Sequence, residues 1–288
     1  MKEYKIVLGI EINNSILRAA EVEQREKGFF LSRIAEQPIA ALDGDELAQK
    51  ISYLINEEGI LSRTVSIAVD TLLTQRDTVP VDSDMERMEI TNFLNSEIEF
   101  HNNFNGGQYV PAYEVVTTPA DGHKEVLYAA IKDDLLKMLR ETCTRCGLDL
   151  QSIDLDHSCS ELLVKRLQAG SKTYILLTVK NGQVEGSLGK NGHRSSYKYM
   201  PYSSEPFYPV TKMAQTLEST TKDYVERIYI TGPAADSFLL DMLRKNVDDR
   251  YELVNPARNL ILSPLATLNQ KFQSAPQNFS AVIGAALK

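Results

Sequence analysis

The turn after the first apolar segment raises the question of whether it binds a phosphate or only connects two strands. Gly9-Ile10-Glu11-Ile12 is short and apolar around one acid, and Ile16–Val22 is apolar again. Asn13-Asn14-Ser15 between them has turn chemistry, because Asn tolerates the left-handed backbone that a two-residue hairpin needs. The segment is therefore predicted as strand, tight turn and strand.

A second group of residues has the chemistry of a zinc site. Cys143, Cys146, His157 and Cys159 would supply N and S ligands for tetrahedral zinc. The cysteine pair lies near a predicted helix end, however, and His157 and Cys159 belong to the next connection. This spacing is unlike that of the common zinc modules, so buried structural thiols are expected here, and no metal.

The other polar candidates have simpler interpretations. Solvated loop positions are expected for His101, His123 and His193, since none has a Ser or Cys partner in a nucleophile motif. The acidic run is expected to be a solvated helix face; it comprises Asp82, Asp84, Glu86 and Glu89. The tyrosine- and proline-rich stretches 197–202 and 207–209 fit a contact surface or, as favoured here, a strand and loop packed over the core.

Charge and hydropathy exclude several classes of protein. Lys and Arg number 31 against 39 Asp and Glu, which gives a formal net charge of −8. The basic residues form no stripe, so nucleic acid is not an expected partner. No apolar run reaches the about 18 residues of a membrane span, and Met1–Lys5 leads into a strand without a signal-peptide region. Three cysteines make no disulfide framework. We therefore expect a cytoplasmic protein without direct membrane insertion.

Apolar periodicity and turn signals divide the chain into blocks. Residues 1–70 are predicted as a first domain with strands Lys5–Ile12, Ser15–Gln24 and Phe29–Pro38, helix Glu46–Asn56 and strand Val65–Val69. Residues 71–150 are predicted as an inserted αβ subdomain with strands Leu72–Val81, Tyr109–Thr117 and Glu125–Lys132, and helices Ser83–His101 and Asp133–Cys146.

Residues 151–278 are predicted as a second domain. It has strand Ile153–Asp156, helix Ser158–Gln168, strands Thr173–Val179, Gln183–Lys190 and His193–Met200, a helical region Glu205–Val225, strand Arg227–Thr231, helix Ala235–Asn246 and strand Tyr251–Val254. Asn-Gly turns join the three consecutive strands. A last helix within 279–288 closes the first domain. Both halves thus begin with a three-strand meander, and this repeat predicts a cleft between them.

This layout resembles the actin-like ATPase superfamily, and within it the PilM family of type IV pilus assembly proteins, relatives of the division protein FtsA. The local strings that carry the resemblance are Gly9–Arg18 (first phosphate loop), Arg33–Pro38 (third strand), 83–117 (inserted subdomain), Glu252–Leu260 (an apolar-Asn-Pro-apolar-Arg-Asn-apolar segment) and Val282–Lys288 (last helix). The resemblance covers nearly the whole chain. It implies an α/β, actin-like (ribonuclease H-like) fold of duplicated ββ-rich αβ domains with a small inserted αβ subdomain.

In that family, one hairpin turn from each half grips phosphate, an acid in each hairpin orients Mg²⁺ and water, and a Gly-Gly turn holds adenosine. Here Asn13 replaces a glycine, Thr178 replaces the second acid, and Pro233 removes a backbone donor. If nucleotide binds, the resemblance assigns its contacts to Glu11, Asn13, Asn14, Ser15, Arg18, Thr178, Lys180, Asn181 and Gly232. Asp154 or Asp156 would restore the missing carboxylate if either pointed into the cleft.

The resemblance implies a scaffold of a type IV pilus-type machine. We expect a pseudo-ATPase without a catalytic residue, located at the inner face of the cytoplasmic membrane through its partners. Its groove, between the first and inserted subdomains, would bind the cytoplasmic peptide of a single-span inner-membrane assembly protein. Self-association stays open. The alternatives are an actin-like ATPase in which ATP and Mg²⁺ gate partner binding or polymerisation, and the cytoplasmic domain of a type II secretion protein.

Overall fold

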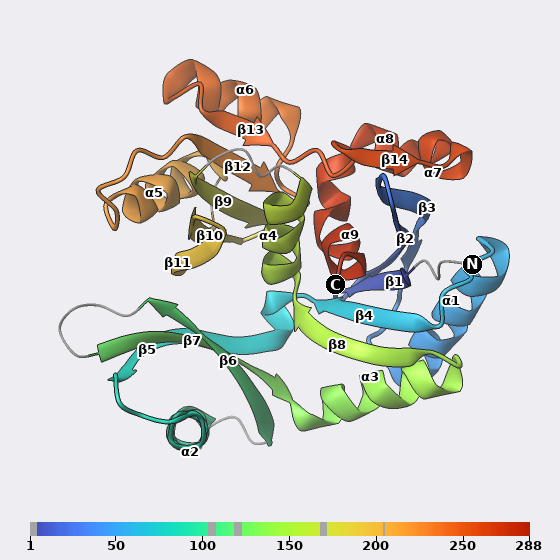
Figure 1. Cartoon of the computed structure of the whole chain (residues 1–288), viewed down its shortest axis with the longest axis horizontal. Coiled ribbons are helices and arrows are strands. Elements are labelled where there is room, and N and C mark those ends of the chain that lie inside the picture. The colour runs from blue at the N-terminus through green and yellow to red at the C-terminus, as the bar shows by residue number, and fades with distance from the viewer. Residues whose placement is uncertain (1–4, 103–107, 118–122, 168–171, 204) are drawn as a thin grey trace.

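A computed structural model describes residues 5–102, 108–117, 123–167, 172–203 and 205–288 (Figure 1). Its strands are β1 (Lys5–Ile12), β2 (Ile16–Arg25), β3 (Gly28–Pro38), β4 (Thr64–Val69), β5 (Thr74–Asp82), β6 (Tyr109–Thr117), β7 (His123–Lys132), β8 (Asp149–Leu155), β9 (Thr173–Lys180), β10 (Gln183–Lys190), β11 (His193–Pro201), β12 (Arg227–Thr231), β13 (Tyr251–Leu253) and β14 (Leu260–Leu262). Its α-helices are α1 (Gly44–Glu57), α2 (Arg87–Asn102), α3 (Asp133–Arg145), α4 (Asp156–Leu167), α5 (Phe207–Glu218), α6 (Ser237–Asn246), α7 (Pro264–Leu268), α8 (Gln270–Ser274) and α9 (Ser280–Ala286). Short 3₁₀ turns are η1 (Thr71–Leu73) and η2 (Pro276–Phe279).

The two halves of the molecule repeat one sheet topology. The first sheet has the order β14-β3-β2-β1-β4-β8, and the second has the order β11-β10-β9-β12-β13. In each, three antiparallel strands form a meander whose first strand then pairs in parallel with the next strand along the chain. The predicted duplication of ββ-rich αβ domains is therefore confirmed.

Two helices, α4 and α9, lie side by side between the two sheets (Figure 1). Two glycines make this packing possible, because each lies where a side chain has no room. A Cβ atom on Gly284 of α9 would lie 1.9 Å from the carbonyl oxygen of Cys159 in α4, and one on Gly9 of β1 would lie 2.0 Å from the carbonyl oxygen of Val282. The last helix thus packs directly on the first strand.

The inserted part contains the third sheet, in the order β5-β7-β6, with α2 on one face. The apolar side of α2, with Ile90, Leu94 and Ile98, packs against Val126 and Tyr128 of β7 in a core of its own. This small core is separate from the cores of the two large sheets.

The boundaries between these parts differ from the predicted ones on one side of the insertion. Strand β8 begins at Asp149 and pairs with β4 at the edge of the first sheet, although residues from 151 onward were assigned to the second domain. Helix α3 was assigned to the inserted subdomain, yet Leu139 and Cys143 pack with Leu47 of α1 in the first core. Both assignments depend on long-range contacts that local sequence patterns do not reveal.

Several element bounds also differ from the prediction. Helix α5 is shorter than the predicted helical region 205–225, α2 starts four residues later than predicted, at Arg87, and η1 occupies the start of the predicted strand 72–81. Strand β14 and the short helices α7 and α8 were not predicted. Within the described residues, no helix combines the length and apolar character that a membrane crossing requires.

Candidate functional site

The side chain of Asn13 closes the turn between β1 and β2. The Oδ1 atom of Asn13 accepts hydrogen bonds from the backbone N–H groups of Ser15, at 2.9 Å, and Ile16, at 2.7 Å. Asn14 and Ser15 are exposed. Backbone N–H groups are what a phosphate-binding turn offers its ligand. The Asn13 side chain, which stands where the family has glycine, therefore occupies two donors of this turn.

Arg18 is held by two acids of the first sheet. Its Nη1 lies 2.8 Å from Glu11 Oε1, its Nε lies 2.7 Å from Glu36 Oε2, and its guanidinium lies over the ring of Phe279. Burial raises the pKa of Glu11, and the neighbouring Arg18 opposes that rise. The second Glu11 oxygen is buried and has no hydrogen-bond partner among the described residues. Glu11 and Arg18 thus form a buried structural pair.

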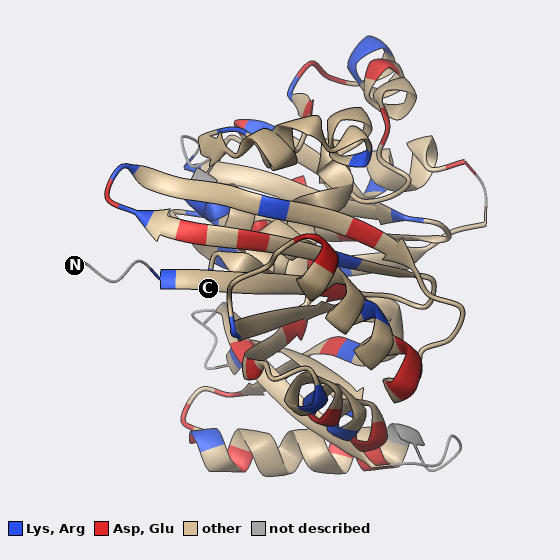
Figure 2. Cartoon of the chain, turned by 90° about the vertical axis from the view of Figure 1, so that its right-hand side faces the viewer, with Lys and Arg blue, Asp and Glu red and all other residues tan. Residues whose placement is uncertain are grey.

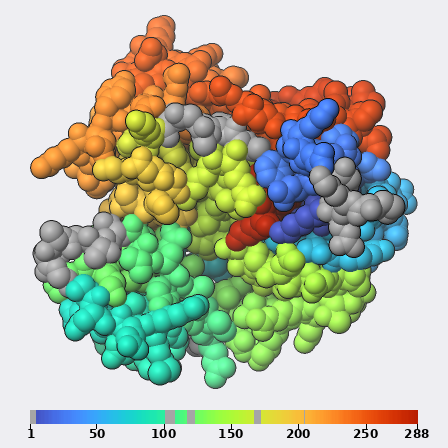
Figure 3. Space-filling view, viewed as in Figure 1, coloured from blue at the N-terminus to red at the C-terminus, as the bar shows by residue number. Residues whose placement is uncertain are grey.

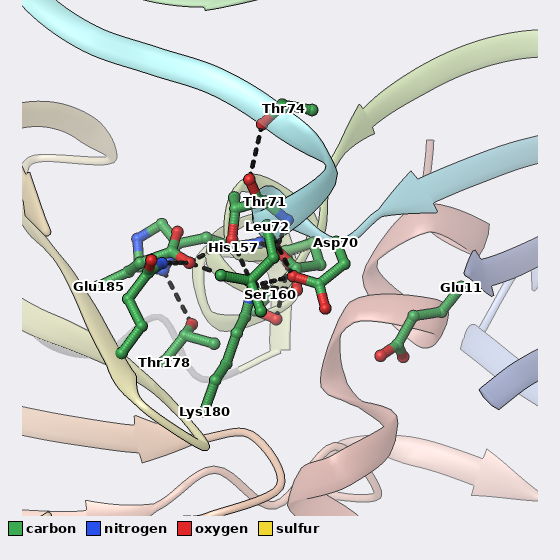
Figure 4. Close-up of polar contacts among 12 residues, drawn as sticks. Glu11, Asp70, Thr71, Leu72, Thr74, His157, Ser160, Thr178, Lys180 and Glu185 are labelled. Atoms are coloured by element: carbon green, nitrogen blue, oxygen red, sulfur yellow. Dashed lines mark hydrogen bonds and ion pairs between the residues drawn. The ribbon is translucent and has the colours of Figure 1, made fainter. Parts of the chain in front are cut away.

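Lys180 ends β9 and extends into a cage of oxygen atoms (Figure 4). Its Nζ lies 2.7 Å from Asp70 Oδ1, 2.7 Å from Asp156 Oδ2 and 3.1 Å from Glu185 Oε1, and it donates a hydrogen bond to the Thr71 hydroxyl. We call these five residues the lysine cage. Glu11 lies apart from the cage in Figure 4. Asp156, which the sequence offered as a replacement for the missing carboxylate, is buried and paired with Lys180.

Burial and mutual charge determine the protonation of the cage. Desolvation raises the pKa of Asp156 to about 7, although Lys180 opposes this. Glu185 is equally buried, yet Lys180 and Arg76 hold its pKa at about 2. The surrounding carboxylates raise the pKa of Lys180 well above its ordinary value. Since an ammonium has three N–H donors and no acceptor, Lys180 stays charged and saturated by its neighbours.

His157, considered above only as a zinc ligand, lies in this buried polar region. Its Nδ1 lies 2.8 Å from the Thr178 hydroxyl and its Nε2 lies 3.0 Å from the Ser187 hydroxyl. Burial lowers the pKa of His157 to about 4, so the ring is neutral at pH 7. Thr178 is thus a hydrogen-bond partner of the imidazole.

Gly232 lies in the loop after β12, the third loop of the predicted nucleotide site. This loop packs on the β9–β10 hairpin. Gly232 has φ +99°, and a Cβ atom there would lie 2.6 Å from the Val179 carbonyl oxygen. The N–H of Ala234 donates to that same carbonyl at 3.1 Å. Asn181 is exposed in the β9–β10 turn. The loop after β12 therefore rests against the end of β9.

The candidate zinc ligands are in different surroundings. Cys143 belongs to the first core, Cys159 is buried between α4 and α9, and Cys146 lies near Ser52. Burial raises the pKa of Cys143 to about 11. In the part of the chain that is described, no group of three or more His, Cys, Asp or Glu side chains is arranged to hold a metal ion.

The remaining candidates are at the surface or cannot be placed. His123 is half exposed and lies 3.3 Å from Asp82, and His193 is exposed. The side chain of His101 lies outside the described residues. Basic and acidic residues are interspersed over the face drawn in Figure 2, as the absence of a basic stripe in the sequence indicated.

A groove of about 390 Å³ lies elsewhere, between the inserted sheet and the first sheet (Figure 3). One wall is β6, from Val110 to Glu114, and another is β8, from Leu150 to Leu155. Each of these strands is the edge strand of its sheet. Apolar side chains line much of the groove; they include Val69, Leu127, Ile131 and Leu136. None of the nine predicted nucleotide contacts lines it.

Arginine and acidic side chains border this groove. Exposed Arg140 of α3 lines it. Arg194 of β11 lies 2.5 Å from the buried Glu161 and also pairs with half-exposed Glu114 of β6. Sequence reasoning did not identify Arg194, Glu161, Glu185 or Asp70. The one local signal was a charged residue within otherwise buried strands, as with Glu185 in β10, whose partners lie far away along the chain.

Comparisons with known proteins support the architecture. No family model matches the chain, and no curated protein does either. Among solved structures, the PilM-PilN type IV pilus biogenesis complex is similar at 18% identity, over 98% of this chain and 97% of that one, with a TM-score of 0.77. A protein from Bacteroides thetaiotaomicron with an actin-like ATPase fold and unknown function shares 12% identity, over 88% and 92% of the two chains, with a TM-score of 0.55.

A third solved structure is the cytoplasmic domain of EpsL, an inner-membrane component of the type II secretion system of Vibrio cholerae. It shares 10% identity over 87% of this chain and 90% of that one, with a TM-score of 0.49. Two observations indicate the same fold. The sheets are duplicated with an insertion between β4 and β8, and the first two solved structures are similar over most of the chain. The chain has the actin-like ATPase fold, in the form that is also found in the PilM-PilN complex.

Proposed function

We propose that this chain is a cytoplasmic actin-like scaffold that binds an extended peptide in the groove between β6 and β8. The peptide would be the cytoplasmic tail of an inner-membrane partner in a type IV pilus-type assembly machine. Binding of the peptide to the groove would not require a nucleotide. The observation that carries the proposal is the pair of edge strands that face one groove.

Edge strands suit an extended peptide because their outer N–H and C=O groups have no partner strand. A peptide that adds a strand gains main-chain hydrogen bonds, and pockets for alternate side chains give it specificity. Here the edges belong to two different sheets, so the peptide can pair with either β6 or β8. The similarity to the PilM-PilN type IV pilus biogenesis complex supports a partner protein of such a machine as the source of the peptide.

The side chains of the groove indicate what such a peptide would contain. Apolar residues from β4, β7 and α3 favour alternating apolar side chains. Exposed Arg140 offers a contact to a carboxylate, and Glu114, whose side chain is half exposed, offers one to a basic residue. We therefore propose a tail that is apolar on one face and carries charged residues on its flanks.

The cleft between the halves supports a scaffold that does not turn over ATP. Asn13 occupies N–H groups of the first turn, Arg18 is paired with two acids, and Lys180 is surrounded by carboxylates. Phosphoryl transfer depends on a metal and on charged groups that are free to stabilise the transferring phosphate. Arg18 and Lys180 are each paired with acids of their own, which favours the pseudo-ATPase interpretation over the gated ATPase.

The experiment is a fluorescence anisotropy titration with a labelled synthetic peptide of the tail of the PilN-type protein from the same organism. Ala112 lines the groove and is exposed, so Ala112→Phe fills the groove at little cost in stability. Val115 lies on the same strand, is 48% exposed and does not line the groove, so Val115→Phe is the matched control. We expect Ala112→Phe to weaken binding about tenfold or more and Val115→Phe to leave it unchanged. Equal binding by both variants, or no binding by the wild-type chain, would reject the proposal.

A further inference from the structure

Lys180 connects parts of the molecule that are far apart in the sequence. The lysine itself ends β9 of the second sheet, Asp70 follows β4 of the first sheet, and Asp156 begins the central helix α4. Lys180 and Asp70 are 110 positions apart along the chain. We propose that Lys180 is a tethered cation that fastens the two domains together, and that its oxygen cage is a binding site for a small primary alkylammonium ion once the tether is removed.

The hydrogen bonds of the cage match the donors of an ammonium group. The Nζ atom has three N–H donors, and Asp70, Asp156 and the Thr71 hydroxyl provide three acceptors. Glu185 adds a further charge at 3.1 Å. Glu185 is itself held by Gln183 at 2.8 Å and by Tyr197 at 2.9 Å, so its carboxylate is fixed in place. The cage is thus built around the Lys180 ammonium, and Arg76 lies 3.6 Å from the same Glu185 oxygen.

The size of the cage also favours an ammonium over a divalent metal. The N–O distances of 2.7 Å to Asp70 and 2.7 Å to Asp156 are those of charge-assisted hydrogen bonds, and Glu185 lies farther away at 3.1 Å. Mg²⁺ requires oxygen atoms at about 2.0–2.1 Å, and Ca²⁺ at about 2.3–2.6 Å. The carboxylates would have to move inward to bind either metal. A primary alkylammonium has the same head group as lysine and needs no such movement.

The tether would hold the two domains together without a bound ligand. In the absence of the lysine, the buried acids from both domains would repel one another, since each is at most 14% exposed. With the lysine, the same acids draw β9, the end of β4 and α4 together. This inference deepens the proposed nucleotide-independent scaffold. The tether is tested by thermal stability alone. The tether can therefore be rejected while peptide binding is confirmed, and peptide binding can be rejected while the tether is confirmed.

Lys180→Ala tests the tether and the site together. The substitution keeps the backbone and Cβ and leaves a space with the shape of n-propylammonium. We expect the midpoint of thermal unfolding to fall by about 10 °C, because a buried charge cluster loses its cation. Millimolar n-propylammonium chloride should restore much of this loss with a saturating dose response. Tetramethylammonium chloride, which has no N–H donor, should restore none.

Lys190→Ala is the matched control, because Lys190 ends the neighbouring strand β10 and its side chain is 48% exposed. It should change the midpoint little and show no response to n-propylammonium. Asp70→Asn provides a second test if Lys180→Ala does not fold: it removes one carboxylate and keeps the lysine, and its midpoint should fall by several degrees. An unchanged midpoint in either cage variant, or a Lys180→Ala loss that tetramethylammonium restores equally well, would overturn the inference.

Discussion

The imidazole of His157 lies 2.8 Å from the Thr178 hydroxyl in the buried interior of the second domain. Thr178 stands where the family resemblance expects an acid that orients Mg²⁺. The hydroxyl instead bonds to a neutral ring that is also bonded to Ser187. This position thus makes an uncharged hydrogen bond where the resemblance implies a carboxylate.

A first prediction concerns the pH dependence of stability. The pKa of His157 is lowered from 6.5 to about 4 in the folded chain, so its stabilising contribution is full above pH 6.5 and is lost as pH falls towards 4. The raised pKa of Asp156 acts in the opposite direction, giving stability that is lost as pH rises through about 7. The pH dependence of the free energy of unfolding must therefore be compared between a variant and the wild type.

We expect His157→Gln to remove about 2 kcal/mol of the acid-induced loss between pH 7.5 and pH 5, measured by urea unfolding at both values. His193→Gln is the control, because His193 is exposed, and it should follow the wild type. If the two variants show the same pH dependence, the assignment of a neutral buried His157 is incorrect.

A second prediction concerns Arg194, which is buried between Glu161 and Glu114. Arg194→Met leaves the Glu161 carboxylate, 1% exposed, without its main partner, so the free energy of unfolding should fall by about 3 kcal/mol. Arg258 pairs with Glu252 at 54% side-chain exposure, and Arg258→Met should cost less than about 0.5 kcal/mol. Chemical denaturation of both variants makes the comparison, and similar losses would show that the Arg194 pair contributes no more than a surface ion pair.

A third prediction concerns the close packing of α9 on α4. The Cβ atom in Gly284→Ala would meet the Cys159 backbone at 1.9 Å, and the helix backbone cannot yield as a side chain can. We expect a loss of about 3 kcal/mol or more. Gly44→Ala is the control, since its Cβ would meet the flexible Met138 side chain at 3.3 Å and the Thr142 hydroxyl at an ordinary contact distance of 3.7 Å. A fully stable Gly284→Ala would mean that the two helices are not packed as described.

A fourth prediction concerns the first turn. Asn13→Gly frees the N–H groups of Ser15 and Ile16, which brings the turn closer to the family's phosphate loop. We nevertheless expect no ATP binding tighter than millimolar in calorimetric titration, because Arg18 and Lys180 remain engaged by their acids. Micromolar, Mg²⁺-dependent binding by the variant would show that Asn13 alone blocks nucleotide.

The sequence predicted the sheet meanders well because local turn chemistry defines them. Asn181-Gly182 and Asn191-Gly192 join β9, β10 and β11 as expected, with Gly182 at φ +86° and Gly192 at φ +80°. Asp43 caps α1 at the start of the predicted helix, with its side chain accepting from the N–H groups of Asp45 and Glu46. The order of these local signals was enough to indicate the duplicated fold.

The sequence could not predict contacts that join distant segments. Strand β14 has only three residues and exists because it pairs with β3, more than two hundred residues earlier. The partners of Lys180 come from three separate elements, so its role as a buried cation was not visible, and a contact with phosphate was the alternative named for it. The groove likewise depends on how the inserted sheet packs against β8.

The most direct test of a nucleotide-independent scaffold is the affinity of the tail peptide, measured by anisotropy with and without Mg²⁺ and ATP. We expect the same dissociation constant in both conditions for the wild-type chain, and weaker binding by Ala112→Phe in both. A dissociation constant that changes severalfold when Mg²⁺ and ATP are added would contradict a nucleotide-independent scaffold, because nucleotide would then control the groove.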